Sequence, residues 1–372
     1  MRIKTTTSEL KYALAKFADI VPPNPSLPVL SCVMIKGKAD GSGVTIVGTN
    51  TDITVQSFIP CVVEIPDTVV VPYRPLSAIA GSAIAGVVGI EAVGDGKVRV
   101  FTKSGRNQIS TMNPELFPVA TRADTEKGVT VPSATLEKIL GQVAFATATP
   151  DQRRKALEGT LVEISGDEIR AVATNGVVLA VSSHHLDAPV DETLPKILLP
   201  LKSNATIRKF LAEGDVKVLL PQDRSYAVFE TQDTLVKTKL IDAEYPNYKS
   251  VVPDAKSPVF SLSVDSAALR AAVKRTSVLS TFSDVCHVKC DFSGQGIALE
   301  AHAEGIGDTQ ESVEVAEFAG NPSVEHFNGA ILVSALASSA SGTVSIARMK
   351  STIPVVIDDG KGYKAVVMPV RV

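Results

Sequence analysis

The sequence has few of the features that mark secreted or membrane-spanning proteins. Only four cysteines occur in 372 residues, too few for the disulfide framework of small secreted domains. The longest uncharged stretch, residues 75–90, is interrupted by serines and glycines, whereas a membrane-spanning helix needs about 20 apolar residues. The first seven residues lack the apolar core of a secretory signal. We therefore expect a cytoplasmic protein without a membrane segment.

Motifs of catalysis and of nucleotide binding are also missing. Two Gly-Lys turns, at residues 96–97 and 360–361, resemble phosphate loops. A P-loop, however, needs a glycine five residues before the Gly-Lys pair and a serine or threonine after it, and neither turn has them. Both turns lie between strand-like runs, so we predict β-hairpins. Without a nucleophile elbow, a zinc-protease motif or a dinucleotide fingerprint, we predict no enzyme and no cofactor.

One short cluster, Cys286-His287-Val288-Lys289-Cys290, could suggest a metal site. On a strand, Cys286 and Cys290 would share one face while His287 points to the other. Zinc needs about four converging ligands, and no second Cys/His pair supplies the rest. We predict buried strand cysteines and no metal.

What the sequence does contain is a threefold internal repeat. Three segments begin at Ser8, Ser133 and Ser266, each after a strand-like run, and continue with apolar or small residues at helical spacing. These positions are Leu10, Ala13, Leu14 and Phe17; Leu136, Ile139, Leu140 and Val143; Leu269, Ala272, Val273 and Thr276. The copies start more than 100 residues apart, far beyond solenoid repeats of about 20 to 50 residues. Each copy is therefore large enough to be a domain.

A second helical pattern follows in each copy. Each copy then ends with an apolar or aromatic residue followed by a proline. The closing pairs are Phe117-Pro118, Tyr245-Pro246 and Met368-Pro369. The predicted helices cover residues 8–18, 73–83, 133–144, 201–212, 266–277 and 329–340. We predict an α+β protein of three repeated two-helix, mostly-strand domains, at residues 1–122, 123–253 and 254–372.

Positive charge is concentrated on the predicted helices. The chain carries 37 basic and 40 acidic residues, but the only helical acids are Glu9 and Glu137. The ten helical cations are Lys11, Lys16, Arg74, Lys138, Lys202, Arg208, Lys209, Arg270, Lys274 and Arg275. A solvated helix face usually mixes both signs, so this segregation favours a surface that follows a polyanion. No base-reading motif is visible, which predicts weak, salt-sensitive and sequence-independent contact with DNA phosphates.

Short motifs along the whole chain resemble those of the bacterial DNA polymerase III beta subunit, the DNA sliding clamp family. They lie at residues 25–30, 48–52, 116–118, 171–176, 245–248 and 366–372. The resemblance implies a DNA clamp fold and a head-to-tail homodimer whose six domains form a ring around duplex DNA. Such a ring is a processivity factor: it tethers the polymerase and, through short hydrophobic motifs, the clamp loader and other partners. A non-ring DNA-associated scaffold and a DNA-modifying enzyme remain open as alternatives.

The resemblance also implies two sets of contact residues. The dimer interface would place Asn107 and Ile109 of the first domain against Val278 and Leu279 of the third. A hydrophobic pocket for partner peptides would have the following wall: Leu157, Thr174, Gly176, Leu179, Pro246, Val251, Asn328, Val366, Val367, Met368, Pro369 and Arg371. An apolar run at the end of the chain has little structural need to lie at the surface, which favours the C-terminal part of this set.

Overall fold

The computed structural model describes residues 1–103, 105–118, 126–150, 154–190, 194–211, 214–252, 258–279, 287–294, 296–349 and 354–371. The chain divides into two compact units, Met1–Ala134 with Ala205–Leu240, and Thr135–Asn204 with Ile241–Val372. Two of the three divisions fall inside helices of the predicted central domain, so that domain contributes to both units. The predicted boundaries at 122 and 253 lie outside the described residues and stay predictions.

The three copies have a similar order of elements, but the second has four strands between its helices where the first and third have five. The first copy contains β1 (Arg2–Thr6), α1 (Thr7–Ala15), β2 (Cys32–Gly37), β3 (Gly43–Thr49), β4 (Ile53–Pro60), β5 (Val62–Ile65), β6 (Thr68–Pro72), α2 (Tyr73–Ser82), β7 (Val87–Ala92), β8 (Lys97–Thr102) and β9 (Arg106–Ser110). The second contains β10 (Glu126–Pro132), α3 (Ser133–Val143), β11 (Gly159–Ser165), β12 (Glu168–Thr174), β13 (Val178–His185), β14 (Ile197–Pro200), α4 (Leu201–Phe210), β15 (Asp215–Pro221), β16 (Tyr226–Glu230) and β17 (Thr234–Lys239). The third contains β18 (Pro258–Asp265), α5 (Ser266–Thr276), β19 (His287–Ser293), β20 (Gly296–Ala303), β21 (Gly307–Val313), β22 (Glu317–Gly320), β23 (Ser323–Asn328), α6 (Gly329–Ala337), β24 (Thr343–Met349), β25 (Val355–Asp358) and β26 (Tyr363–Val367). The α+β repeat is confirmed.

The first helix of each copy begins directly after a strand, and in α1 and α5 a polar side chain satisfies one of the free N–H groups. Thr6 and Glu9 form a capping box on α1, and Asp265 caps α5 by accepting from the Ala268 N–H at 2.7 Å. The apolar positions predicted for α1, α3 and α5 are buried. Helical periodicity in the sequence thus identified the faces that form the core.

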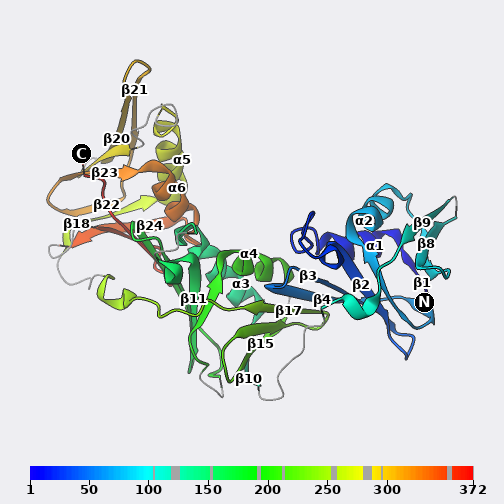
Figure 1. Ribbon diagram of the computed structural model, residues 1–372. Helices are drawn as coiled ribbons and strands as arrows, with labels where there is room; N and C mark the ends of the chain where they lie inside the picture. The colour runs from blue at the N-terminus through cyan, green and yellow to red at the C-terminus, as the bar shows by residue number, and fades with distance from the viewer. Residues whose placement is uncertain are drawn as a thin grey trace. The chain divides into compact units, whose positions relative to one another are not determined.

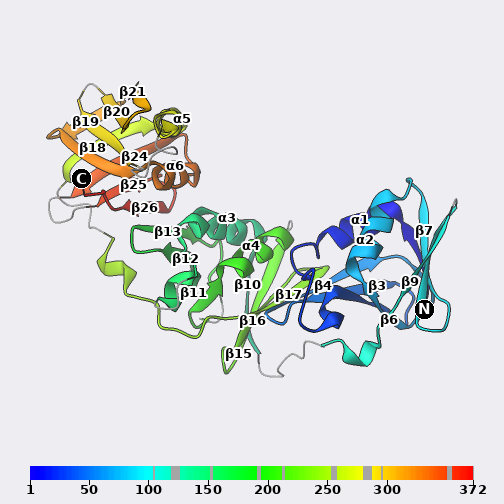
Figure 2. The same ribbon diagram turned by 45° about the horizontal axis from the view of Figure 1, so that its top comes forward.

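The first unit contains two antiparallel sheets, with strand orders β5-β1-β7-β8-β9 and β10-β15-β16-β17-β4-β3-β2-β6. In the larger sheet, β17 of the second copy pairs with β4 of the first. Helices α1 and α2 lie side by side (Figures 1 and 2), and the Tyr73 hydroxyl donates to the Leu14 carbonyl at 3.0 Å. Segments remote in sequence therefore form one continuous sheet.

The second unit repeats this arrangement. Its sheets have the orders β14-β11-β12-β13-β26-β25-β24-β18-β22 and β21-β20-β19-β23. Strand β26 of the third copy pairs with β13 of the second, as β17 pairs with β4. Helices α5 and α6 pack together beside the larger sheet (Figure 2), where the Ser266 hydroxyl donates to the Leu336 carbonyl at 3.2 Å.

Several smaller predictions can also be compared with the structure. Both Gly-Lys turns join antiparallel strands, β7 to β8 and β25 to β26, which confirms the hairpins. Cys290 is buried on β19, and burial raises the pKa of its thiol; Cys286 lies outside the described residues. In the part of the chain that the structure describes, no cluster of side chains suits a metal ion, and no helix is both long and apolar enough to span a membrane.

Candidate functional site

The cations predicted to contact DNA are distributed over five of the six helices. Seven of the ten are exposed, whereas Lys16, Lys138 and Arg208 are half-buried. The most open pair is on α5, where Arg270 and Lys274 are four residues apart and therefore lie one above the other on the exposed side. Helix α6 contributes no charge. The cationic surface is thus a property of particular helices and is not uniform over the repeat.

Five of these cations are engaged within the protein, Arg208 and four with the following partners. The Lys16 ammonium lies 3.4 Å from an Asp233 oxygen and 3.2 Å from the Ser57 hydroxyl, and its side chain is only 14% exposed. Lys209 pairs with Asp19, and Arg275 forms two hydrogen bonds to Glu311, at 2.7 and 2.9 Å. Lys11 donates to the Ala83 carbonyl at 3.2 Å. These cations would have to exchange a partner before contacting a phosphate.

The five cations other than these four and Arg208 are more available. Arg74, Lys138, Lys202, Arg270 and Lys274 form no ion pair with another described residue. Arg208 does have an interaction.

A tight turn organises the predicted peptide pocket in the second unit. It joins β12 to β13, and Asn175 stabilises it by accepting from the N–H groups of Val177 and Val178 at 2.9 and 3.0 Å. The Thr174 hydroxyl donates to the Val178 carbonyl at 2.7 Å and accepts from the Gly176 N–H at 3.1 Å. Gly176 has φ +89°, a conformation that glycine adopts without steric cost.

Much of the predicted pocket wall belongs to the core. Leu179 and Val366 are buried in one hydrophobic cluster with Tyr245 and Tyr248. Val367 is 1% exposed and Leu157 is 9% exposed. Val366 and Val367 are buried on β26, which pairs with β13, and their place in a pocket wall stays a prediction.

The apolar surface at this place comes from other side chains. Val177 is 44% exposed, Val251 is 48%, Met368 is 36% and Val370 is 38%. The Met368 N–H donates to the Val177 carbonyl at 2.9 Å, so these two residues are neighbours. Val177 and Val370 were not among the predicted wall residues. Their only signal was an apolar residue close to a strand end, which is common and therefore weak.

The remaining wall residues have polar or structural positions. Asn328 caps α6 by accepting from the Ile331 N–H at 3.2 Å. The Val370 N–H donates to the His326 carbonyl at 2.7 Å, which holds the C-terminal segment against β23. Gly176, Pro246 and Arg371 are exposed, and Thr174 and Pro369 are half-buried.

A hydrogen-bond network around Tyr248 lies next to the predicted pocket residues. The Tyr248 hydroxyl donates to Glu163 at 2.5 Å and accepts from Arg170 at 3.1 Å. Burial, followed by the hydrogen bond to Glu163, raises the pKa of Tyr248 to about 12. Arg170 also binds Glu168 at 2.6 Å and the Ser183 hydroxyl at 2.8 Å. The network fixes the segment that follows Tyr245-Pro246 on the sheet.

The residues predicted for the dimer interface are at two separate places in the fold. Asn107 is exposed and Ile109 is 7% exposed, both on β9, which is an edge strand of its sheet. Val278 is 52% exposed and Leu279 is half-buried, just after α5. An edge strand offers unpaired N–H and C=O groups to another chain.

Comparison with protein families covers nearly the whole chain. Models of the DNA polymerase III beta subunit match in order: the N-terminal domain at residues 1–121, the central domain at 130–247 and the C-terminal domain at 249–371. The chain belongs to the DNA polymerase III beta subunit family. The resemblance found in the sequence motifs is therefore confirmed.

Individual relatives agree with this assignment. The chain is 26% identical to the beta sliding clamp of Escherichia coli K12 over 376 residues, which cover 98% of this chain and 99% of the relative. A crystal structure of the Pseudomonas aeruginosa sliding clamp is 25% identical, with a TM-score of 0.90 and complete coverage of both chains. The beta subunit structure of Streptococcus pyogenes has a TM-score of 0.92 at 19% identity, again over both full chains. The three-domain clamp fold is thus confirmed.

Proposed function

We propose that this chain is a processivity factor of DNA replication, a sliding clamp that encircles duplex DNA and tethers a polymerase. The observation that carries the proposal is the match of all three domains to the clamp family. The concentration of cations on the helices of a chain with net negative charge agrees with it. The non-ring scaffold is not favoured. The clamp would act without catalysis or a cofactor, and the cytoplasm is its proposed location because its ligand is chromosomal DNA.

The proposed DNA contact is weak and independent of sequence. The five available cations belong to four helices of repeated type, and a cation that neutralises one phosphate releases counterions without reading a base. The five other helical cations, Arg208 among them, already have interactions, which lowers the gain from each new phosphate contact. Weak phosphate contacts are sufficient for a ring, because its closure around the duplex retains it on DNA while individual contacts form and break.

Ring closure is proposed to use the β9 edge of one chain and the segment after α5 of another. Two copies joined by this heterologous contact form a closed ring if the rotation between them closes. Val278 offers the most exposed apolar side chain of the predicted set.

Partner peptides are proposed to bind beside the Thr174 turn, on the exposed apolar group of Val177, Val251, Met368 and Val370. Polymerases and the clamp loader would carry the short hydrophobic motifs that bind there.

A salt titration tests the DNA contact. Changing Lys202, Arg270 and Lys274 to alanine should weaken duplex binding equally for all sequences. If each residue contacts one phosphate, the slope of log affinity against log salt should fall by about 0.9 per contact. A matched control changes three exposed lysines outside the helices, Lys36, Lys97 and Lys361, which should leave the slope unchanged. A loss confined to certain sequences would contradict the proposal.

A further inference from the structure

The turn at Thr174 has a twin in the first unit. Between β3 and β4, Asn50 accepts from the N–H groups of Asp52 and Ile53 at 3.0 and 2.8 Å. The Thr49 hydroxyl donates to the Ile53 carbonyl at 3.0 Å and accepts from the Thr51 N–H at 3.1 Å. Each bond corresponds to one in the turn that joins β12 to β13. The two loops have the same backbone hydrogen bonds.

The next strand of each sheet continues the correspondence. Lys237 of β17 lies opposite Thr54, as Val366 of β26 lies opposite Leu179. The Lys239 N–H donates to the Asp52 carbonyl at 2.9 Å. This bond matches, in length and position, the one from Met368 to Val177.

The corresponding side chains have opposite chemistry. Leu179, Val366, Met368 and Val177 of the second unit correspond to Thr54, Lys237, Lys239 and Asp52 of the first. Four apolar side chains are thus replaced by one hydroxyl, two ammonium groups and one carboxylate. We call the turn and the strand paired beside it the frame. The frame of the first unit is unsuited to a hydrophobic motif, because each of its polar groups would lose water without gaining a partner.

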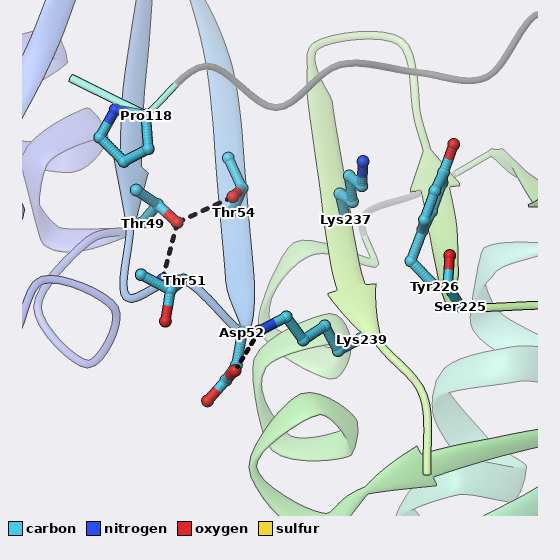
Figure 3. A pocket seen from close by; sticks show the side chains of 9 residues that line it. All are labelled: Thr49, Thr51, Asp52, Thr54, Pro118, Ser225, Tyr226, Lys237 and Lys239. Atoms are coloured by element: carbon cyan, nitrogen blue, oxygen red, sulfur yellow. Dashed lines mark hydrogen bonds and ion pairs between the residues drawn. The ribbon is translucent and has the colours of Figure 1, made fainter. Parts of the chain in front are cut away.

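A cavity of about 380 Å³ opens at the polar copy, within the usual range for a bound ligand. Figure 3 shows the hydroxyls of Thr49 and Thr54 on one side and Lys237 beside Tyr226 on the other. The Lys237 ammonium lies 3.7 Å from the centre of the Tyr226 ring.

The charge of the cavity favours an anionic ligand. Among the described residues, its lining has two lysines and one carboxylate, Asp52, and Lys237 also has a further interaction. Lys239 pairs with Asp52 at 3.0 Å, but both side chains are well exposed, at 62% and 71%, and such a pair is weak. A ligand carboxylate can therefore replace Asp52. A second carboxylate nearby, Asp223, accepts two hydrogen bonds from Ser225, and these bonds together with the charge of Lys237 lower its pKa.

The cavity lies on the sheet face opposite α1. Gly48 faces this helix, since a side chain there would meet the Phe17 ring, and Ser57 accepts from Lys16 of the same segment. Successive strand residues point to opposite faces, so Thr49, Thr54 and Lys237 point away from the helices. The face that would contact DNA phosphates carries the helices, which leaves the cavity for a different ligand.

We propose that this cavity is a second docking site, which binds a short acidic segment of a partner protein. Two acidic side chains would bind Lys237 and Lys239 by charge-assisted hydrogen bonds, and the Tyr226 ring would contact an apolar side chain between them. The choice of a peptide rests on the proposed function, because the twin of this frame is the proposed peptide pocket. The choice of acidic side chains rests on the cavity alone.

The test uses the full-length chain and a fluorescein-labelled hexapeptide with four glutamates around a leucine-phenylalanine pair. Anisotropy should show binding to the wild type, and the double change Lys237→Met and Lys239→Met should weaken it at least tenfold. The control is Lys36→Met with Lys38→Met, which removes the same charge on the same sheet and includes a lysine over an aromatic ring, Phe58, at 4.1 Å. The control should bind like the wild type.

Three further arms decide the identity of the ligand. A peptide with glutamine in place of glutamate should bind at least tenfold more weakly. Inorganic phosphate and a short DNA duplex, compared with potassium chloride at equal ionic strength, should not displace the acidic peptide. Equal loss in both lysine pairs, or displacement by phosphate or duplex, would overturn the proposal. Met368→Ser should leave acidic-peptide binding intact. This variant therefore separates a failure of the proposed hydrophobic pocket from a failure of the proposed acidic-peptide site.

Discussion

The loops at Thr49 and Thr174 have the same backbone hydrogen bonds, but the side chains around them differ in polarity. In both, a Thr-Asn pair forms the turn and a strand from the following copy pairs beside it. The first loop lies beside an open polar cavity, whereas the second adjoins a hydrophobic core with a narrow exposed apolar rim. The comparison teaches that hydrogen bonding of the main chain preserves the frame, while side chains at four positions determine what the frame can bind.

The largest difference between the two regions should appear in stability. Leu179→Ala removes a buried side chain from a packed cluster, and we expect a loss of about 2 to 5 kcal/mol in the free energy of unfolding. Thr54→Ala removes a hydroxyl bonded to Thr49 at 2.8 Å, for which about 1 kcal/mol is expected. Urea unfolding measures both. Equal losses would show that the polar copy is as much a part of the core as the apolar one.

A second effect concerns binding at the apolar copy. Met368→Ser with Val370→Ser keeps both backbone hydrogen bonds of the C-terminal segment but removes its exposed apolar groups. Each such group contributes at most about 1.5 to 3 kcal/mol when buried by a ligand, so a labelled peptide with leucine and phenylalanine anchors should bind ten- to a hundredfold more weakly. The control Ile84→Ser changes an apolar side chain that is 80% exposed elsewhere. Unchanged peptide binding by the Met368 and Val370 variant would contradict the proposed location of the pocket.

The smallest effect concerns the turns. Thr51 has φ +78° where the twin turn has glycine at φ +89°, and a β-branched residue is strained in that region. Thr51→Gly should raise the free energy of unfolding by up to about 1 kcal/mol, since relief of strain exceeds the entropy that glycine adds to the unfolded chain. Gly176→Thr should lower it by a similar amount. Destabilisation by Thr51→Gly would instead indicate that the threonine side chain stabilises the loop.

The sequence predicted the elements well because their signals are local. Helical spacing placed the starts of α1, α3 and α5, and the Asp-Gly and Gly-Lys turns predicted the hairpins. The pairings of β4 with β17 and of β13 with β26 could not be predicted, because strands so far apart leave no local signal of their register. That register places Val366 and Val367 in the buried part of the sheet, whereas Met368 and Val370, further along the chain, are exposed.

The candidate sites were predicted unevenly for the same reason. Charge segregation indicated the helical cations, but the ion pairs of Lys16 and Lys209 join residues distant in sequence and were invisible to it. The lysine cavity was missed entirely. Thr49, Asn50 and Asp52 belong to a motif that the resemblance used, yet Lys237 and Lys239 look like ordinary exposed strand lysines until the sheet brings them beside it.

Ring formation is the claim on which the proposed function depends, and the mass of the protein in solution tests it most directly. Sedimentation at micromolar concentration should give twice the mass of one chain. Val278→Glu with Leu279→Glu should give folded single chains, because an unpaired charge buried in an interface costs several kcal/mol, while Ile84→Glu with Val87→Glu should leave the dimer. A wild-type protein that sediments as a single chain would contradict the account.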